Sequence, residues 1–455
     1  MLDGEPEHPQ VASGSLNRRG LRGGARTDRP SIPPPFARQP AQGGVSRAAV
    51  RATRHGPLTR GTTLHTWYRR VTVTLLTITA LLLSTLGVGL ATTPTDDPVE
   101  AAAGWLATQL VDDERIEVVF GDDTFDDAGL TADVVYALAA AGVASGSIAS
   151  AADWLETQVG AYTGTDFGST FAGATAKLIL VAATTDRDPT SFGGVDLVAQ
   201  LEALEADSGR FSDDATDFET GDPADFSNTI TQSLALIALQ RASGGPSDTA
   251  VGFLIDQACG DGGFPIVLEG DDCTSGVDAT AFAVLALAAV GGDDATAAVD
   301  AATAWLLGVQ QVDGSFVGDE GANSNTTGLA AAALATVGED AAAAAARDWV
   351  LTLQHGCDDA EPGAIAFDPD DSGDRVRATP QALLGLTGTS LAVVSSAGAS
   401  AAVPVLHCPD TAATDELETL PETGVAAPLV VLLAALLVAA GLLSLSAASR
   451  RLVRR

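Results

Sequence analysis

The sequence predicts an all-α fold, an (α/α)6 barrel (toroid) in which six helix pairs close into a ring. An aromatic or apolar residue followed by glutamine recurs along the middle of the chain. From Trp105 to Trp349 this pattern spans 244 residues over five intervals, about 49 residues each. Most copies are followed by a glycine-aromatic loop and then by a helix rich in Ala and Leu. Such a period is typical of repeated helix pairs.

The first helix of each predicted pair carries the aromatic residue and the glutamine. Its copies are Trp105 to Gln109, Trp154 to Gln158, a degenerate copy near Leu201, Phe253 to Gln257, Trp305 to Gln310 and Trp349 to Gln354. Charged residues such as Asp153, Glu156 and Arg347 accompany them. One side of each of these helices is therefore expected to face solvent.

The second helix of each pair is almost free of charge, and a helix that is apolar all round is a buried one. These helices are predicted to open with capping residues, whose side-chain oxygens satisfy free N–H groups of a first turn. The predicted caps are Thr131, Thr170, Asn228, Asp278, Asn325 and Thr379. Six inner and six outer helices favour a closed barrel, with an open solenoid as the alternative.

The segment from Trp305 to Phe316 resembles the QW repeat of squalene-hopene cyclases and of protein prenyltransferase β subunits, with Phe in place of the final Trp. The resemblance covers about residues 98–390. It implies the toroid, which cobalamin carriers and complement thioester domains also use, more strongly than any activity. Trp105, Trp154, Trp305, Trp349 and their glutamine partners are expected to pack neighbouring helices together.

One motif matches the catalytic pattern of this family. Triterpene cyclases protonate an alkene with the acid of a DxDD motif, and Asp368-Pro-Asp370-Asp371 has that spacing. It lies in a Pro-containing loop of an Asp-rich chain, so we assign no catalytic residue to it. The chain also lacks the Cys-Gly-Glu-Gln segment of thioester domains, a glycine-rich phosphate loop, an HExxH helix and a GxSxG elbow.

The same acidic loop is a candidate calcium site, because calcium takes several carboxylate and carbonyl oxygens from a loop. The candidate ligands are Asp368, Asp370, Asp371 and Asp374, followed by Asp122, Asp123, Asp126 and Asp127, and by Asp213, Asp214 and Asp217. No loop matches an EF-hand, and solvated loop charge is the alternative interpretation.

A ligand-binding face is expected where the loops enter the inner helices, because the helix N-termini converge there around a central depression. The residues expected on this face are Asp166, Phe167, Phe171, Phe226, Asn228, Asp278, Asn323 and Asn325. Aromatic side chains beside Asn and Asp are typical of a carbohydrate or corrinoid platform. Each alone also fits ordinary loop packing.

Charge is unevenly distributed along the 455 residues, whose formal net charge is −35. Residues 1–70 hold 12 Arg and 4 acidic residues, and residues 425–455 hold 4 Arg and no acid. Between them lie 55 acidic and 8 basic residues, a net charge of −47. Unaided nucleic-acid binding is therefore excluded. The two basic ends are expected to be targeting segments, separate from the acidic middle part of the chain.

The N-terminal part is predicted to be a basic, disordered leader over 1–70, or an extension upstream of the true start. The apolar segment 71–91 follows Arg69 and Arg70 and ends in the small residues Gly89 and Ala91, which is typical of a signal peptide. Its 21 residues also suffice to span a bilayer, so an uncleaved membrane anchor is the alternative.

The C-terminal part resembles the cell-wall sorting signal of Gram-positive surface proteins. The motif is Leu420, Pro421, Glu422, Thr423 and Gly424, followed by a hydrophobic segment over 425–448 and a basic tail over 449–455. The resemblance implies that sortase joins Thr423 to peptidoglycan, whereas a simple C-terminal membrane anchor is the alternative. An Ala/Ser/Thr-rich segment and stalk over 391–419 would separate this signal from the toroid.

Four cysteines in an exported chain favour disulfides. Of the three possible connectivities, the preferred one pairs Cys259 with Cys273 and Cys357 with Cys408. A zinc site is the competing interpretation, because His355 and His407 lie near Cys357 and Cys408.

These observations predict a secreted, cell-wall-anchored protein whose toroid binds an extracellular ligand or mediates adhesion without catalysis. Its expected partners are sortase, peptidoglycan, an unknown extracellular ligand and, transiently, the membrane. The alternatives are an extracellular enzyme, terpene-cyclase-like or polysaccharide-active, and a purely structural wall protein.

Overall fold

The computed structural model describes residues 92–121, 123–217, 220–270, 272–319 and 321–409. The leader, the segment 71–91 and the sorting signal lie outside these residues. In the described ranges, no helix is both long and apolar enough to cross a membrane.

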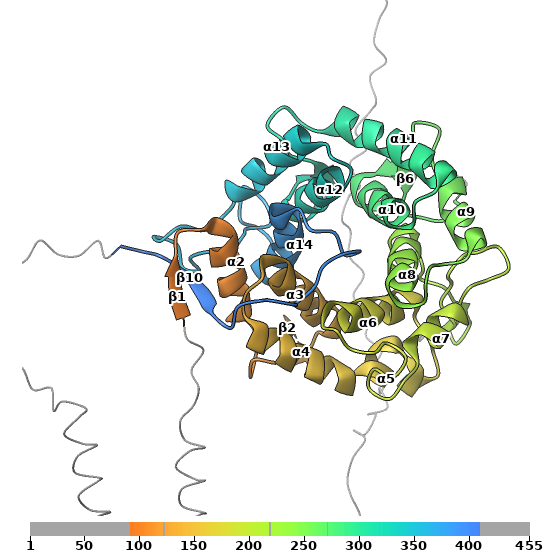
Figure 1. The fold of residues 1–455 in the computed structure, drawn as a ribbon, viewed down its shortest axis with the longest axis horizontal. Coiled ribbons are helices and arrows are strands. Elements are labelled where there is room, and N and C mark those ends of the chain that lie inside the picture. Colours follow the sequence, from red (N-terminus) through yellow and green to blue (C-terminus); the bar gives the residue numbers. More distant parts are fainter. Residues whose placement is uncertain (1–91, 122, 218–219, 271, 320, 410–455) are drawn as a thin grey trace, which may run out of the picture. The chain divides into compact units, whose positions relative to one another are not determined.

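Two concentric layers of helices form a closed ring (Figure 1). The inner helices are α3 (Ala128–Ala141), α6 (Ala172–Thr184), α8 (Thr229–Ala242), α10 (Val277–Val290), α12 (Ser324–Thr336) and α14 (Arg375–Thr387). Each inner helix contacts the next, and α14 returns to contact α3. This contact between the last and the first inner helix confirms the closed barrel that the sequence predicts, rather than the open solenoid.

The outer layer alternates with the inner layer along the chain. It consists of α2 (Pro98–Ala107), α4 (Ser145–Thr157), α7 (Leu197–Glu202), α9 (Asp248–Asp256), α11 (Asp293–Val309) and α13 (Asp340–Leu351), with the short α5 (Val159–Thr163) and the 3-10 helix η1 (Thr165–Phe167) after α4. The inner helices are buried around most of their circumference, whereas the outer helices expose one side. This difference agrees with their charge content.

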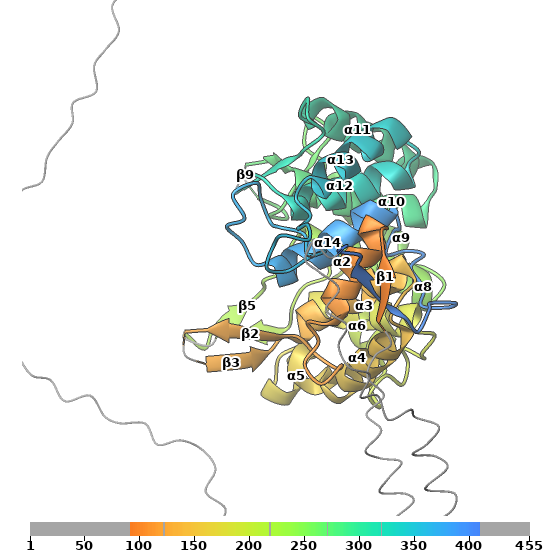
Figure 2. The ribbon, with the colours of Figure 1, turned by 90° about the vertical axis from the view of Figure 1, so that its left-hand side faces the viewer.

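Short β-hairpins lie at one end of the ring, where the outer helices lead into the inner ones (Figure 2). The pairs are β2 (Glu117–Phe120) with β3 (Asp123–Asp126), β4 (Ala215–Thr216) with β5 (Pro223–Ala224), β6 (Phe264–Pro265) with β7 (Ser275–Gly276), and β8 (Val317–Gly318) with β9 (Gly321–Ala322). All four pairs are antiparallel. The N-termini of the inner helices therefore share the hairpin end of the ring.

Hydrogen bonds from the loops to the inner helices repeat around the ring. In four repeats a buried threonine hydroxyl on the inner helix accepts a hydrogen bond from a backbone N–H of the preceding loop. The pairs are Thr131 with Ile116, Thr280 with Phe264, Thr327 with Phe316, and Thr379 with Ile365, at 2.9 to 3.1 Å. Because an unpaired buried N–H is costly, these bonds fix each loop to the helix that follows it.

Glutamines connect successive repeats, as the pattern predicts for two of its copies. The Gln310 amide donates to the carbonyl oxygen of Ala342 on α13 at 2.9 Å. The Gln354 amide donates to the carbonyl oxygen of Pro98, 2.7 Å away at the start of α2, and so joins the last repeat to the first. By contrast, the amides of Gln109 and Gln158 bond within their own helix ends.

The predicted caps are correct at one helix only. Asn228 caps α8, since its side-chain oxygen accepts from two backbone N–H groups. Helices α3, α12 and α14 begin earlier than predicted, with Asp127, Asn323 and Asp374 as caps. Thr131, Asp278, Asn325 and Thr379 lie inside their helices, and Thr170 lies before α6. Thr131 and Thr379 do not cap their helices because their hydroxyls accept hydrogen bonds from the loop backbone instead.

The chain after α14 crosses the other end of the ring. Backbone bonds join Ser396 to Thr184 and Ser400 to Gly142, at the C-terminal ends of α6 and α3. The chain then forms β10 (Val403–Leu406), which pairs in parallel with β1 (Thr92–Thr95). The first part of the segment expected over 391–419 therefore belongs to the folded body.

Candidate functional site

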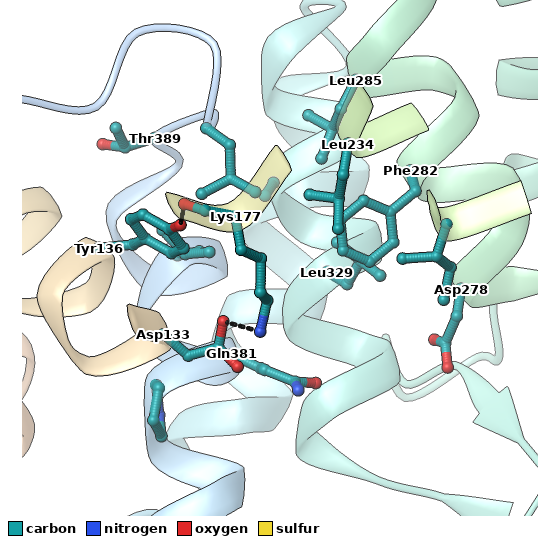
Figure 3. Close-up of a pocket in the computed structure, with 15 residues that line it drawn as sticks. Asp133, Tyr136, Lys177, Leu234, Asp278, Phe282, Leu285, Leu329, Gln381 and Thr389 are labelled. Atoms are coloured by element: carbon teal, nitrogen blue, oxygen red, sulfur yellow. Dashed lines mark hydrogen bonds and ion pairs between the residues drawn. The ribbon is translucent and has the colours of Figure 1, made fainter. Parts of the chain in front are cut away.

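A cavity of about 260 Å³ lies inside the ring of inner helices (Figure 3). It is lined by Asp133, Tyr136, Lys177, Ile230, Leu234, Asp278, Phe282, Leu285, Leu329, Ala332, Pro380, Gln381, Leu384, Thr389 and Leu391. All six inner helices contribute to it, so the closed ring creates it. Its volume is slightly below the ~300–1,000 Å³ typical of small-molecule sites.

One wall of the cavity is apolar. Helix α10 places Phe282 and Leu285 on it, and α12 and α8 add Leu329 and Leu234 (Figure 3). Asp278, Phe282 and Leu285 follow the i, i+4, i+7 spacing of one helix face, so the sequence of α10 alone aligns them. The apolar wall favours a hydrocarbon ligand.

Asp278 is the acid at the hairpin end of this wall. Its Oδ1 atom is buried without a hydrogen-bond partner, although the Thr326 hydroxyl bonds the same carboxyl group. Burial raises the pKa of Asp278 above its ordinary value, the nearby Asp319 adds to the rise, and the Thr326 bond opposes it. Asp278 therefore combines access to the cavity with an increased tendency to carry a proton.

The opposite wall is polar. Lys177 on α6 forms an ion pair with Asp133 on α3, with 2.6 Å between Nζ and Oδ1. Burial alone would lower the pKa of Lys177. The electrostatic interactions with Asp133 and Tyr162 outweigh the effect of burial, so the pKa of the lysine is raised. The Tyr136 hydroxyl donates to the backbone oxygen of Lys177 at 2.5 Å. Gln381 on α14 projects toward the same side (Figure 3).

The chain after α14 closes the cavity at the end remote from the hairpins. Thr389 and Leu391 line the cavity there. The Arg241 guanidinium on α8 donates to the carbonyl oxygens of Leu391 and Val394, both at 2.7 Å. Burial lowers the pKa of Arg241, yet these bonds hold the segment against the inner helices.

A second hollow of about 460 Å³ lies beside the cavity at the hairpin end. Asp278 and Ile230 line both hollows, and Trp305 and Asp319 line the outer one. Large apolar side chains are exposed in the connections on this side of the ring. They are Val119, Phe125, Phe167, Phe226, Ile266, Val267, Val312 and Val317. Of these, Ile266 and Val317 line the outer hollow.

The residues expected on the ligand face are spread over this end of the ring. Asp278 alone among them lines the cavity. Asn228 and Asn323 cap helices, and Asn325 is half-buried with an unpartnered Oδ1. Asp166 and Phe167 are exposed in η1, and Phe226 packs its ring against Phe171 with 6.5 Å between centroids.

The acidic loop between α13 and α14 lies at the surface. Asp368 accepts hydrogen bonds from Ser372, and Asp371 forms an ion pair with Arg375. Asp374 caps α14, and Asp370 is exposed. The structure groups no three His, Cys, Asp or Glu side chains as a metal site in the ranges that it describes. Calcium binding by this loop stays a prediction, and Asp122 lies outside the described residues.

Two disulfides form, Cys259 with Cys273 and Cys357 with Cys408. They use all the cysteines in the pairing that the sequence favours over zinc. The first closes the loop between α9 and α10, and the second ties the chain after β10 to the loop after α13.

No protein-family model matches the chain, and no curated protein matches it. Solved structures with a similar fold include the type II terpene cyclase MstE from Scytonema, at 16% identity over 64% of this chain and 96% of that one, with a TM-score of 0.49. An unsaturated glucuronyl hydrolase from Bacillus sp. GL1 matches at 13% identity over 64% and 94%, with a TM-score of 0.46. The ent-copalyl diphosphate synthase from Streptomyces platensis matches at 22% identity over 58% and 52%, with a TM-score of 0.39.

The expectation that leaned away from an enzyme is contradicted by this comparison. The three solved structures are those of a terpene cyclase, an unsaturated glucuronyl hydrolase and a diphosphate synthase, all of them enzymes. At these identities the likeness extends to the fold alone, so the chemistry of this chain must be argued from its own cavity.

The polar wall is what sequence reasoning missed. Lys177 is the only lysine of the chain, and it lies in a helix predicted to be buried. Asp133 lies in another such helix. A charge inside a helix that is otherwise apolar all round must find a partner or face a cavity, and this signal identifies both residues.

Proposed function

We propose that the toroid is an enzyme that protonates a carbon–carbon double bond of an isoprenoid-class substrate, with Asp278 as the general acid. The observation that carries this proposal is the unpartnered, buried Oδ1 of Asp278 at the edge of an apolar cavity. A general acid needs a carboxyl group that keeps its proton and a position within reach of the substrate. Burial helps Asp278 to keep its proton, and its place in the lining of the cavity brings it within reach of the substrate.

The reaction balances without a cofactor. Asp278 gives its proton to one carbon of the double bond, and a carbocation forms at the other carbon. A second double bond of the same chain attacks the cation, which forms a carbon–carbon bond, and a proton then leaves to the Asp278 carboxylate or to water. The product is an isomer of the substrate. The apolar wall excludes water, and Phe282, which lines the cavity, is an aromatic residue of the kind that stabilises a cation.

Polysaccharide cleavage is the runner-up, because two carboxyl groups, those of Asp133 and Asp278, line one cavity. The pairing of Asp133 with Lys177 and the apolar wall count against it. A sugar would leave many hydroxyl groups without partners on that wall.

A solvent-label experiment separates the two proposals. The full chain is incubated in D2O with farnesol, squalene or unsaturated glucuronyl oligosaccharides, and the products are analysed by mass spectrometry. We expect a cyclised isomer that carries one deuterium at the protonated carbon. Cleavage of the oligosaccharides with no change in either isoprenoid would overturn the proton-transfer proposal in favour of the runner-up.

We also propose that the protein is exported and joined to peptidoglycan by sortase through Thr423. The two disulfides support export, since disulfides persist in oxidising surroundings. Thr423→Ala is expected to move the protein from the peptidoglycan fraction into the medium or membrane. Glu422→Ala is the matched control, because Glu422 occupies the one variable position of the LPxTG motif. Equal wall linkage of both variants would contradict attachment at Thr423.

A further inference from the structure

The two walls of the cavity differ in the ligand atoms they suit, and this difference bears on the substrate class. The inference below rests on the proposed function. Apolar side chains from α8, α10 and α12 form one wall, and Asp133, Lys177 and Gln381 lie on the other (Figure 3). A pure hydrocarbon would leave these three polar side chains buried against it, which is unfavourable.

The polar wall has unused hydrogen-bonding capacity. An ammonium group has three donors, and Lys177 uses one for Asp133 at 2.6 Å and one for the Gly129 carbonyl oxygen at 3.2 Å. One donor remains. Gln381 lines the cavity with an exposed side chain, and its amide forms no hydrogen bond with the described residues. Both groups thus have donors available on one side of the cavity.

The charge on this wall is balanced. Asp133 neutralises Lys177, and the neighbouring Arg377 forms its own pair with Asp127 at 2.8 Å. Asp278 adds a further acid on the opposite wall. A diphosphate or carboxylate would bring negative charge into a cavity without an uncommitted cation, at a large desolvation cost. A neutral oxygen atom has no such cost and accepts from the same donors.

We propose that Lys177 and Gln381 bind the oxygen atom of a neutral head group, a hydroxyl or a carbonyl, on an otherwise hydrocarbon substrate. Asp133 holds the lysine in place and accepts a hydrogen bond where the head group is a hydroxyl. This contact fixes the polar end of the substrate on the α3, α6 and α14 side. The hydrocarbon chain then lies along α8, α10 and α12, whose hairpin end carries Asp278.

The test measures binding to the full chain carrying Asp278→Asn, so that turnover does not consume the probes. Farnesol, farnesene and farnesyl diphosphate share a hydrocarbon chain and differ at its end. We expect farnesol to bind about tenfold more tightly than farnesene in calorimetry. The hydrogen bonds of its hydroxyl group with Lys177 and Gln381 account for a difference of this size. Gln381→Leu is expected to reduce this preference severalfold. Gln240→Leu is the matched control, because Gln240 lies near the C-terminal end of α8 and does not line the cavity. We expect this variant to keep the preference for farnesol.

A second variant keeps the test independent of folding defects. Asp133→Leu with Lys177→Met removes the ion pair as a unit, because removing one partner would leave the other charge buried alone. We expect this protein to keep its thermal midpoint and to lose the preference for farnesol.

The outcomes separate this inference from the proposed function. Equal affinity for farnesol and farnesene overturns the head-group site and leaves proton transfer by Asp278 in place. Tightest binding of farnesyl diphosphate overturns the neutral head group. If none of the three probes binds, both the inference and the isoprenoid proposal fail.

Discussion

Asp278→Asn is expected to lower turnover of the isoprenoid substrate by about 10²- to 10⁴-fold, the usual contribution of a general acid. The amide has nearly the same shape and keeps a hydrogen-bond acceptor for the Thr326 hydroxyl, so the fold should be unchanged. It has no acidic proton to transfer. The measurement is the rate of product formation under saturating substrate, together with circular dichroism to confirm folding.

The pH dependence of the same reaction gives an independent check. The acid form of Asp278 exists below its pKa, which burial and Asp319 raise, so activity should be full at low pH and fall as pH rises through that value. Asp319→Asn removes a like charge, lowers the pKa of Asp278 and should move this fall to lower pH. A fall that does not move in Asp319→Asn, or full activity in Asp278→Asn, would contradict the assignment.

Gly385→Val is expected to destabilise the ring by about 3 kcal/mol, at the upper end of the usual cost of overpacking. Helices α12 and α14 cross at Gly328 and Gly385. A Cβ atom added at Gly385 would lie 2.2 Å from the backbone oxygen of Gly328 and 2.6 Å from its Cα atom. Neither backbone atom moves without displacing an inner helix. The free energy of unfolding from urea titration measures the effect.

Gly252→Ala is the matched control for this substitution. Gly252 lies inside the outer helix α9, and an added Cβ atom would meet nothing within 4 Å. This variant is expected to be more stable by about 0.5–1 kcal/mol, since glycine is a poor residue for a helix interior. Equal effects of the two substitutions would show that the crossing of α12 and α14 does not depend on glycine.

The ring was predictable because its signals are local and repeated. The aromatic residue and glutamine, the glycine-aromatic loop and the uncharged second helix recur in order, and each carries physical information about burial. Helix starts were less predictable. A threonine such as Thr131 bonds either to the first turn of its helix or to the preceding loop, and only the path of the loop decides which.

The site was predictable in part for a similar reason. Asp278 stood on the expected ligand face because the N-termini of inner helices converge. Its raised pKa depends on burial by neighbouring repeats, which no single repeat encodes. The Asp368 motif attracts attention through its spacing, yet it lies in a solvent-exposed loop, where an acid does not keep its proton unusually well.

The disulfide between Cys357 and Cys408 determines how the folded body would respond to mechanical tension. Cys408 follows β10 and is bonded to a residue 51 positions earlier. If the C-terminus is held in the wall as proposed, a pulling force enters at Cys408 and passes through the sulfur–sulfur bond to the loop after α13. Residues 358–407, which include α14 and β10, then lie off the load path. Stretching of the wall would therefore not pull directly on α14, the inner helix that carries Gln381.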